Sequence, residues 1–85
     1  MKLRALSDEQ ATELAHLLGM ETGVFHLHKD CYRISLWTMG QSFVSYWVYN
    51  DGEKALYNTD TGIEDSVMQE VIEMFLEEFG EEPAE

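Results

Sequence analysis

The residues best suited to chemistry are two histidines two positions apart, followed by an acid and the chain's one cysteine: His26, His28, Asp30 and Cys31. On a β-strand, residues two apart point to the same side, and imidazole with thiolate is a ligand combination that zinc accepts. The sequence has no second ligand pair at a recognisable spacing, and His16 falls on a helix. The pattern is more typical of surface or partly buried histidines, so we expect no bound metal and no other cofactor.

Signatures of catalysis are equally weak. The sequence has no glycine-rich phosphate loop, no zinc-protease helix motif and no nucleophile elbow. Cys31 follows His28 closely, but a nucleophilic thiol needs a base and an orienting group in three dimensions, and any short hairpin can bring two such residues together. Most carboxylates fall on solvated helix faces, where their pKa values have no reason to move. We therefore expect a binding protein and not an enzyme.

Acidic residues are concentrated toward the carboxyl end. The 85 residues include 17 acids and five bases, for a formal net charge of −12, and no Lys or Arg follows Lys54. Acids near the negative, C-terminal end of a helix cost roughly 0.3–1 kcal/mol each. Either the stability of the protein tolerates this cost, or the acids are retained because they contact a basic partner. The candidate contact residues, here called the acidic row, are Glu70, Glu73, Glu77 and Glu78.

The middle of the chain is rich in aromatic and β-branched residues, as strands are. Alternation separates a uniformly apolar side, which we assign to the core, from a side that carries aromatic residues with His26, His28 and Arg33. Trp, Tyr, Met and Arg are over-represented at interface hot spots. Two alternatives stay open: a helix or loop covers this second side, or the second side is the core and the first is exposed. If neither holds, the candidate contact residues on the second side are Trp37, Trp47 and Tyr49.

Two helices are expected to flank these strands. The first begins at a capping-box pattern, Ser7 with Gln10, and stops at Gly19. Its apolar face consists of Ala11, Leu14, Ala15, Leu17 and Leu18. The second begins near a repeat of that pattern, Thr61 with Glu64, and ends at Gly80. Its apolar arc is wider than one sheet contact requires, which favours contact with the first helix as well or a homodimer interface.

Strands are expected near residues 24–28, 32–39 and 43–49, with a short fourth strand at 55–57 after the Asn50-Asp51-Gly52 turn signal. Short connections make neighbouring strands antiparallel. The sequence therefore predicts an α+β fold: a small antiparallel sheet of three to four strands with an N-terminal and a C-terminal helix (α-β-β-β-(β)-α), both helices on one face. Residues 1–80 form this single domain, and residues 81–85 are expected to be a disordered acidic tail.

The charge argues against direct binding to nucleic acid and to anionic membranes. One cysteine, no apolar amino-terminal run and no apolar stretch long enough to span a bilayer favour a cytoplasmic location. In size and charge the chain is similar to the small acidic inhibitors that phages deploy against host nucleases and polymerases, although no motif is shared. That likeness implies a stoichiometric inhibitor or modulator that docks on a basic surface of a nucleic-acid-handling protein, in its strongest form by imitating a nucleic-acid backbone.

The alternative is an adaptor or subunit of a constitutive intracellular complex. Such a protein would use the aromatic side of the sheet, or a homodimer interface, in place of the acidic row.

Overall fold

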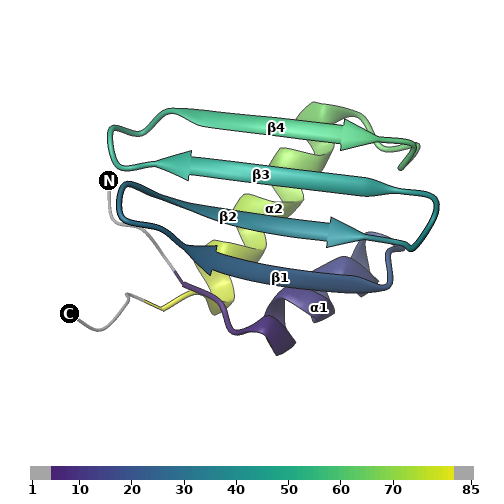
Figure 1. The fold of residues 1–85 in the computed structure, drawn as a ribbon, viewed down its shortest axis with the longest axis horizontal. Helices are drawn as coiled ribbons and strands as arrows, with labels where there is room; N and C mark the ends of the chain where they lie inside the picture. The colour runs from purple at the N-terminus through teal and green to yellow at the C-terminus, as the bar shows by residue number, and fades with distance from the viewer. Residues whose placement is uncertain (1–4, 82–85) are drawn as a thin grey trace.

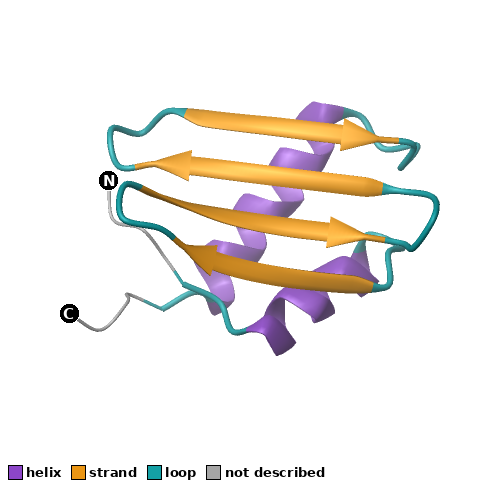
Figure 2. Cartoon of the chain, in the orientation of Figure 1, coloured by secondary structure: helices purple, strands orange, loops and turns teal. Residues whose placement is uncertain are grey.

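The computed structural model describes residues 5–81, which form one sheet with two helices behind it (Figure 1). The elements are α1 (Asp8–Leu17), β1 (Thr22–Leu27), β2 (Cys31–Trp37), β3 (Phe43–Tyr49), β4 (Lys54–Thr59) and α2 (Asp65–Phe79). The α+β class and the placement of both helices on one face are confirmed (Figure 2). None of the helices formed by these residues has the length and apolarity needed to cross a membrane.

The four strands form an antiparallel meander in the order β1-β2-β3-β4. The bounds of β3 agree with the prediction, whereas β1 begins at Thr22 and β2 ends at Trp37, both earlier than expected. The fourth strand runs from Lys54 to Thr59 and pairs along its whole length with β3, so it is a full member of the sheet. The two edges of the sheet are therefore β1 and β4.

The core lies between the sheet and the helices. The sheet contributes six side chains that are at most 4% exposed: Tyr32, Ile34, Leu36, Val44, Tyr46 and Val48. These belong to the side that alternation assigned to the core, and that assignment is confirmed. Leu14 and Ala15 of α1 pack on them, together with Met68, Ile72, Phe75 and Leu76 of α2.

The apolar arcs of both helices extend beyond this core. Leu17, expected on the buried face of α1, is 69% exposed, so that part of the prediction is wrong. On α2, Val67, Met74 and Phe79 are 47%, 62% and 44% exposed. These four residues, here called the helix strip, leave apolar surface in contact with water on the helical side of the molecule.

The first helix is capped at both ends as its sequence indicates. The Gln10 amide donates to Ser7 Oγ at 3.1 Å, and the Ser7 amide donates to Gln10 Oε1 at 3.0 Å, which completes the capping box. At the other end Gly19 adopts a φ of 80°, and the Met20 amide donates to the Ala15 carbonyl at 2.7 Å. This left-handed glycine ends the helix in a Schellman arrangement.

The second helix begins differently from the prediction. Its N-cap is Glu64, which makes no side-chain cap hydrogen bond. The Thr61 hydroxyl instead donates to Asn58 Oδ1 at 2.6 Å and accepts from the Ile63 amide at 3.2 Å. Because Thr61 is engaged in this turn before the helix, the capping box expected at Thr61 and Glu64 does not form.

The backbone edge of β1 is covered by α1. Thr12 Oγ1 donates to the Gly23 carbonyl at 3.1 Å and accepts from the Gly23 amide at 3.4 Å, and Asp8 Oδ1 accepts from the Phe25 amide at 3.2 Å. A Cβ at Gly23 would overlap the Ala11 carbonyl oxygen, so glycine is what allows the helix to lie this close. The α1 side chains thereby take up hydrogen-bonding groups that a further strand would use.

The two ends of the described chain meet beside the helices. The Ala5 amide donates to the Glu81 carbonyl at 2.6 Å, and the Glu81 amide donates to the Ala5 carbonyl at 3.0 Å. Glu81, expected to be the first residue of the disordered tail, therefore pairs with the amino-terminal segment. The rest of that tail, residues 82–85, lies outside the described residues.

Candidate interaction surface

The sheet face opposite the helices is covered by no element of residues 5–81 (Figure 1). We call this surface the open face. Its strand residues, placed by the register, are Thr22, Val24, His26, Cys31, Arg33, Ser35, Trp37, Phe43, Ser45, Trp47, Tyr49, Ala55, Tyr57 and Thr59. The predicted anchors Trp37, Trp47 and Tyr49 all lie on it, which is the condition under which they were proposed.

Aromatic side chains of the open face reach solvent to different extents. Phe43, Tyr49 and Tyr57 are 39%, 37% and 60% exposed, and both tryptophans are partly exposed. The rings of Phe43 and Tyr57 pack edge to face with centroids 6.0 Å apart. Tyr57 is not among the contact residues predicted from the sequence, because only a short fourth strand is expected there. The alternation of Tyr57 with Leu56 nevertheless indicates that the two side chains lie on opposite faces of the sheet.

The register arranges the open face in rows that cross the strands. Trp37 of β2 lies beside Phe43 of β3, and Arg33 lies beside Trp47. Between these two bulky rows Ser35 pairs with Ser45, and the neighbouring side chains leave the two serines only 8% and 6% exposed. The small serines thus form a low floor between larger side chains.

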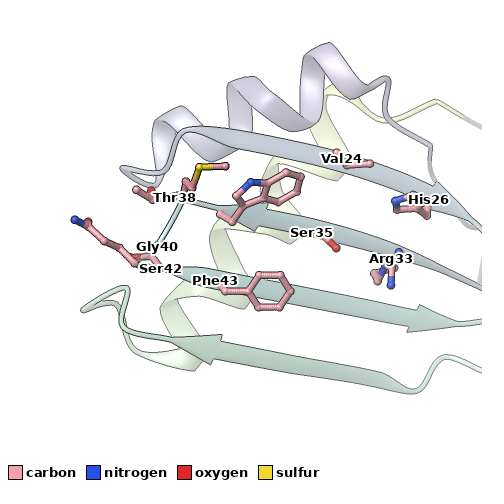
Figure 3. A pocket seen from close by; sticks show the side chains of 11 residues that line it. Val24, His26, Arg33, Ser35, Thr38, Gly40, Ser42 and Phe43 are labelled. Carbon is pink, nitrogen blue, oxygen red and sulfur yellow. The ribbon is translucent and has the colours of Figure 1, made fainter.

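One end of this floor opens into a shallow pocket of about 670 Å³ above β1, β2 and the connection to β3. Figure 3 shows Ser35 at the centre of the pocket, with Phe43 on one side and Arg33 and His26 toward the other. Trp37 also lines it. The pocket therefore combines aromatic walls with a cationic end.

Planar side chains stack at that cationic end. Arg33 Cζ lies 5.0 Å from the centroid of the Trp47 ring. The Trp47 ring stacks with His28, and His28 stacks with His26, each pair with centroids 6.1 Å apart. Arg33 Nε is buried and has no hydrogen-bond partner among the described residues. A buried N–H group without a partner costs about 1–3 kcal/mol, so this guanidinium has unused hydrogen-bonding capacity.

The histidine and cysteine cluster does not assemble into a ligand set. Within residues 5–81, no three His, Cys, Asp or Glu side chains converge as a metal centre requires. His26 and His28 instead stack on each other, and Cys31 is 8% exposed as a free thiol at one end of β2. The chemistry of this region is that of stacking and charge.

The acidic row is divided by the structure. Glu70, Glu77 and Glu78 are exposed, and the last turn of α2 contains no base. Glu73 instead faces the sheet, where it pairs with Lys54 Nζ at 3.1 Å and accepts a hydrogen bond from the Tyr46 hydroxyl at 3.0 Å. No Lys or Arg follows Lys54 in the sequence, yet Glu73 does have a base beside it, because β4 brings Lys54 to it.

The same contacts shift the pKa values of the groups around Glu73. Partial burial by itself raises the pKa of Glu73, but hydrogen bonds from Gln69, Lys54 and Tyr46, with the Lys54 charge, outweigh it and hold the pKa below its usual range. Burial raises the pKa of Tyr46 strongly, and the Glu73 carboxylate raises it further. Burial and the same carboxylate raise the pKa of Tyr32 to about 12. The Glu73 carboxylate thus has a structural role: it accepts hydrogen bonds that join α2 to β3 and β4.

Comparisons with protein families, with curated proteins and with solved structures found no match to this chain. The open face and the exposed part of the acidic row are therefore the features that bear on function.

Proposed function

We propose that the chain is a protein-binding module, an adaptor or subunit of a complex, that contacts its partner through the open face. The observation that carries this proposal is a sheet face that no element of residues 5–81 covers and on which aromatic side chains surround a floor of two serines. Contiguous apolar surface on a small protein marks an interaction site. Aromatic residues and arginine are the side chains that dominate interface energetics.

Substitution of single aromatic residues tests this proposal. Trp47→Ala and Tyr57→Ala remove open-face surface without entering the core, so each variant should unfold close to the wild-type temperature. Met74→Ala is the matched control, because Met74 is 62% exposed but lies on the helix strip. We expect the two open-face variants to lose a partner that the wild type captures from cell extract, while Met74→Ala retains it. Retention by both open-face variants would exclude this surface.

A second function is favoured by the exposed part of the acidic row. Glu77 and Glu78 lie in the last turn of α2, where they oppose the helix dipole and no base compensates them. In this function the chain is a stoichiometric inhibitor or modulator that docks these acids and Glu70 on a basic surface of a nucleic-acid-handling protein. Catalysis and direct binding to nucleic acid have no part in either function.

Ionic strength separates the two functions. A complex held by the acidic row weakens steeply as salt rises, because screening acts on exposed charges, whereas a complex held by desolvated aromatic residues weakens little. Charge reversal at Glu77 and Glu78 should slow association with a basic partner. Reversal at both Glu9 and Glu13, which are exposed on α1, changes the net charge by the same amount and is the control. Equal effects of both reversals would point to net charge and remove the acidic row as a contact.

A further inference from the structure

Arg33 is the cation of the described chain that is placed to meet a ligand. Residues 5–81 contain three Lys or Arg side chains: Lys29, Arg33 and Lys54. Lys54 pairs with Glu73, and Lys29 lies in the connection between β1 and β2. Arg33 lies on the open face, where no carboxylate of the described residues lies within ion-pair distance. Its Nε is buried without a hydrogen-bond partner.

The surroundings of Arg33 differ in charge from the rest of the molecule. The chain has a net charge of −12, yet none of the strand residues on the open face is acidic. His26 is the register partner of Arg33 on β1, and His28 stacks on Trp47 nearby. The open face therefore offers a locally cationic site, which is complementary to a carboxylate. Because Nε is covered, the terminal Nη groups of the guanidinium over the Trp47 ring are the ones that can form paired bonds to such a group.

The pocket beside Arg33 adds an apolar subsite at a defined separation. Arg33 and Trp37 lie four residues apart on β2, which places their Cα atoms about 13 Å apart. Phe43 stands beside Trp37 across the strand pair, and Ser35 forms the floor between (Figure 3). A ligand that fills both ends therefore needs an apolar group and an anion roughly four residues apart on an extended peptide, a spacing that also places both side chains on the same side of it.

We propose that the pocket beside Arg33 recognises a carboxylate-bearing segment of a protein partner, with Asp or Glu on Arg33 and an apolar side chain against Trp37 and Phe43. This inference rests on the open face being the contact surface and specifies the chemistry of the partner. A single-stranded nucleic acid shares the combination of anion and planar group. Its successive phosphates, however, require several cations, and Arg33 is the one Lys or Arg among the described strand residues of the open face.

Two matched peptides test the proposal on the wild-type protein. The probes are the acetylated, amidated pentapeptides Phe-Gly-Gly-Gly-Asp and Phe-Gly-Gly-Gly-Asn, which differ in the carboxylate alone. Their binding is followed by NMR through the Arg33 Nε–H and Trp37 indole N–H signals. We expect the Asp peptide to shift both signals and to bind at least about tenfold more tightly than the Asn peptide, because the Asn amide offers the guanidinium neither a negative charge nor a second oxygen.

Two variants assign that preference to Arg33. Arg33→Gln should bind the two peptides equally, whereas Lys29→Gln, which removes the same charge outside the pocket, should retain the tenfold preference. Arg33→Lys keeps the charge without the planar fork and should retain a smaller preference. The comparison of the two peptides is made on the wild type, so it tests carboxylate recognition even if a variant fails to fold.

Several results would overturn the proposal. These are equal binding of the two peptides to the wild type, shifts confined to the helices, or no shift at either signal up to about 10 mM peptide. Larger shifts with an oligothymidine than with the Asp peptide would assign the pocket to nucleic acid. If Trp47→Ala still abolishes partner capture while the peptides are not distinguished, the open face remains the contact surface and the carboxylate specificity alone is wrong.

Discussion

Reversing the charge of Glu73 is expected to destabilise the fold, although Glu73 belongs to a row of acids. Charge pattern alone predicts that Glu73→Lys and Glu77→Lys both leave the fold intact or slightly more stable. The structure distinguishes them, because Glu73 accepts from the hydroxyl of Tyr46, which is 0% exposed, and pairs with Lys54. Glu77 lies one turn later and is exposed.

The magnitude follows from the two interactions that this substitution removes. Leaving the buried Tyr46 hydroxyl without its acceptor costs about 1–3 kcal/mol. The Lys54–Glu73 pair, whose side chains are 30% and 37% exposed, adds roughly 0.2–1 kcal/mol because solvent screens it. We therefore expect Glu73→Lys to lower the free energy of unfolding by about 1–4 kcal/mol, or Tm by about 5–30 °C in a domain of this size. Glu77→Lys should raise stability by roughly 0.3–1 kcal/mol through the helix dipole.

Urea and thermal unfolding followed by far-UV circular dichroism measure both effects at neutral pH. A double-mutant cycle with Lys54→Met and Glu73→Gln separates the ion pair from the Tyr46 hydrogen bond. Wild-type stability in Glu73→Lys would refute the structural role of this carboxylate. Equal destabilisation by Glu77→Lys would show that the effect does not come from the contact with the sheet.

Three further predictions concern other parts of the fold. Gly23→Ala should destabilise by about 1–3 kcal/mol in urea unfolding, because its Cβ would overlap the Ala11 carbonyl oxygen; a wild-type midpoint would argue against the close approach of α1 and β1. Burial raises the pKa of Tyr46, so the unfolded chain loses its proton first and stability should fall as pH rises above about 10; Tyr46→Phe should flatten that fall, and an unchanged slope would contradict the assignment. Ser7→Ala should cost about 1 kcal/mol through removal of the N-cap, and a change near zero in the urea midpoint would mean that the capping box contributes nothing.

Local patterns predicted the features that local physics determines. The bounds of β3 and the buried side of β2 and β3 follow from strict alternation, which permits one register against the helices. The capping box at Ser7 formed because its two partners are neighbours in sequence. The same pattern at Thr61 failed because the Thr61 hydroxyl donates to Asn58 and accepts from the Ile63 amide instead.

These local patterns could not predict contacts between elements that are far apart in the sequence. The acidic row contains chemically equivalent residues, and Glu73 is distinguished by Lys54 and Tyr46, which come from other elements. The aromatic anchors were identified from alternation, but the unsatisfied Arg33 Nε depends on the packing around it and has no signal in the sequence. Tyr57 joined the open face because β4 pairs along its full length.

Because α1 covers the edge strand β1, the two edges of the sheet differ in their ability to pair with another strand. Asp8 and Thr12 occupy backbone groups of one border strand, so a strand from outside can extend the sheet of residues 5–81 beside β4 alone. If two molecules paired through their β4 strands, the edge strands of the resulting eight-stranded sheet would be the two β1 strands, each covered by its α1 helix. Lateral growth would then stop at a pair, which protects this aromatic-rich protein against open-ended fibre formation.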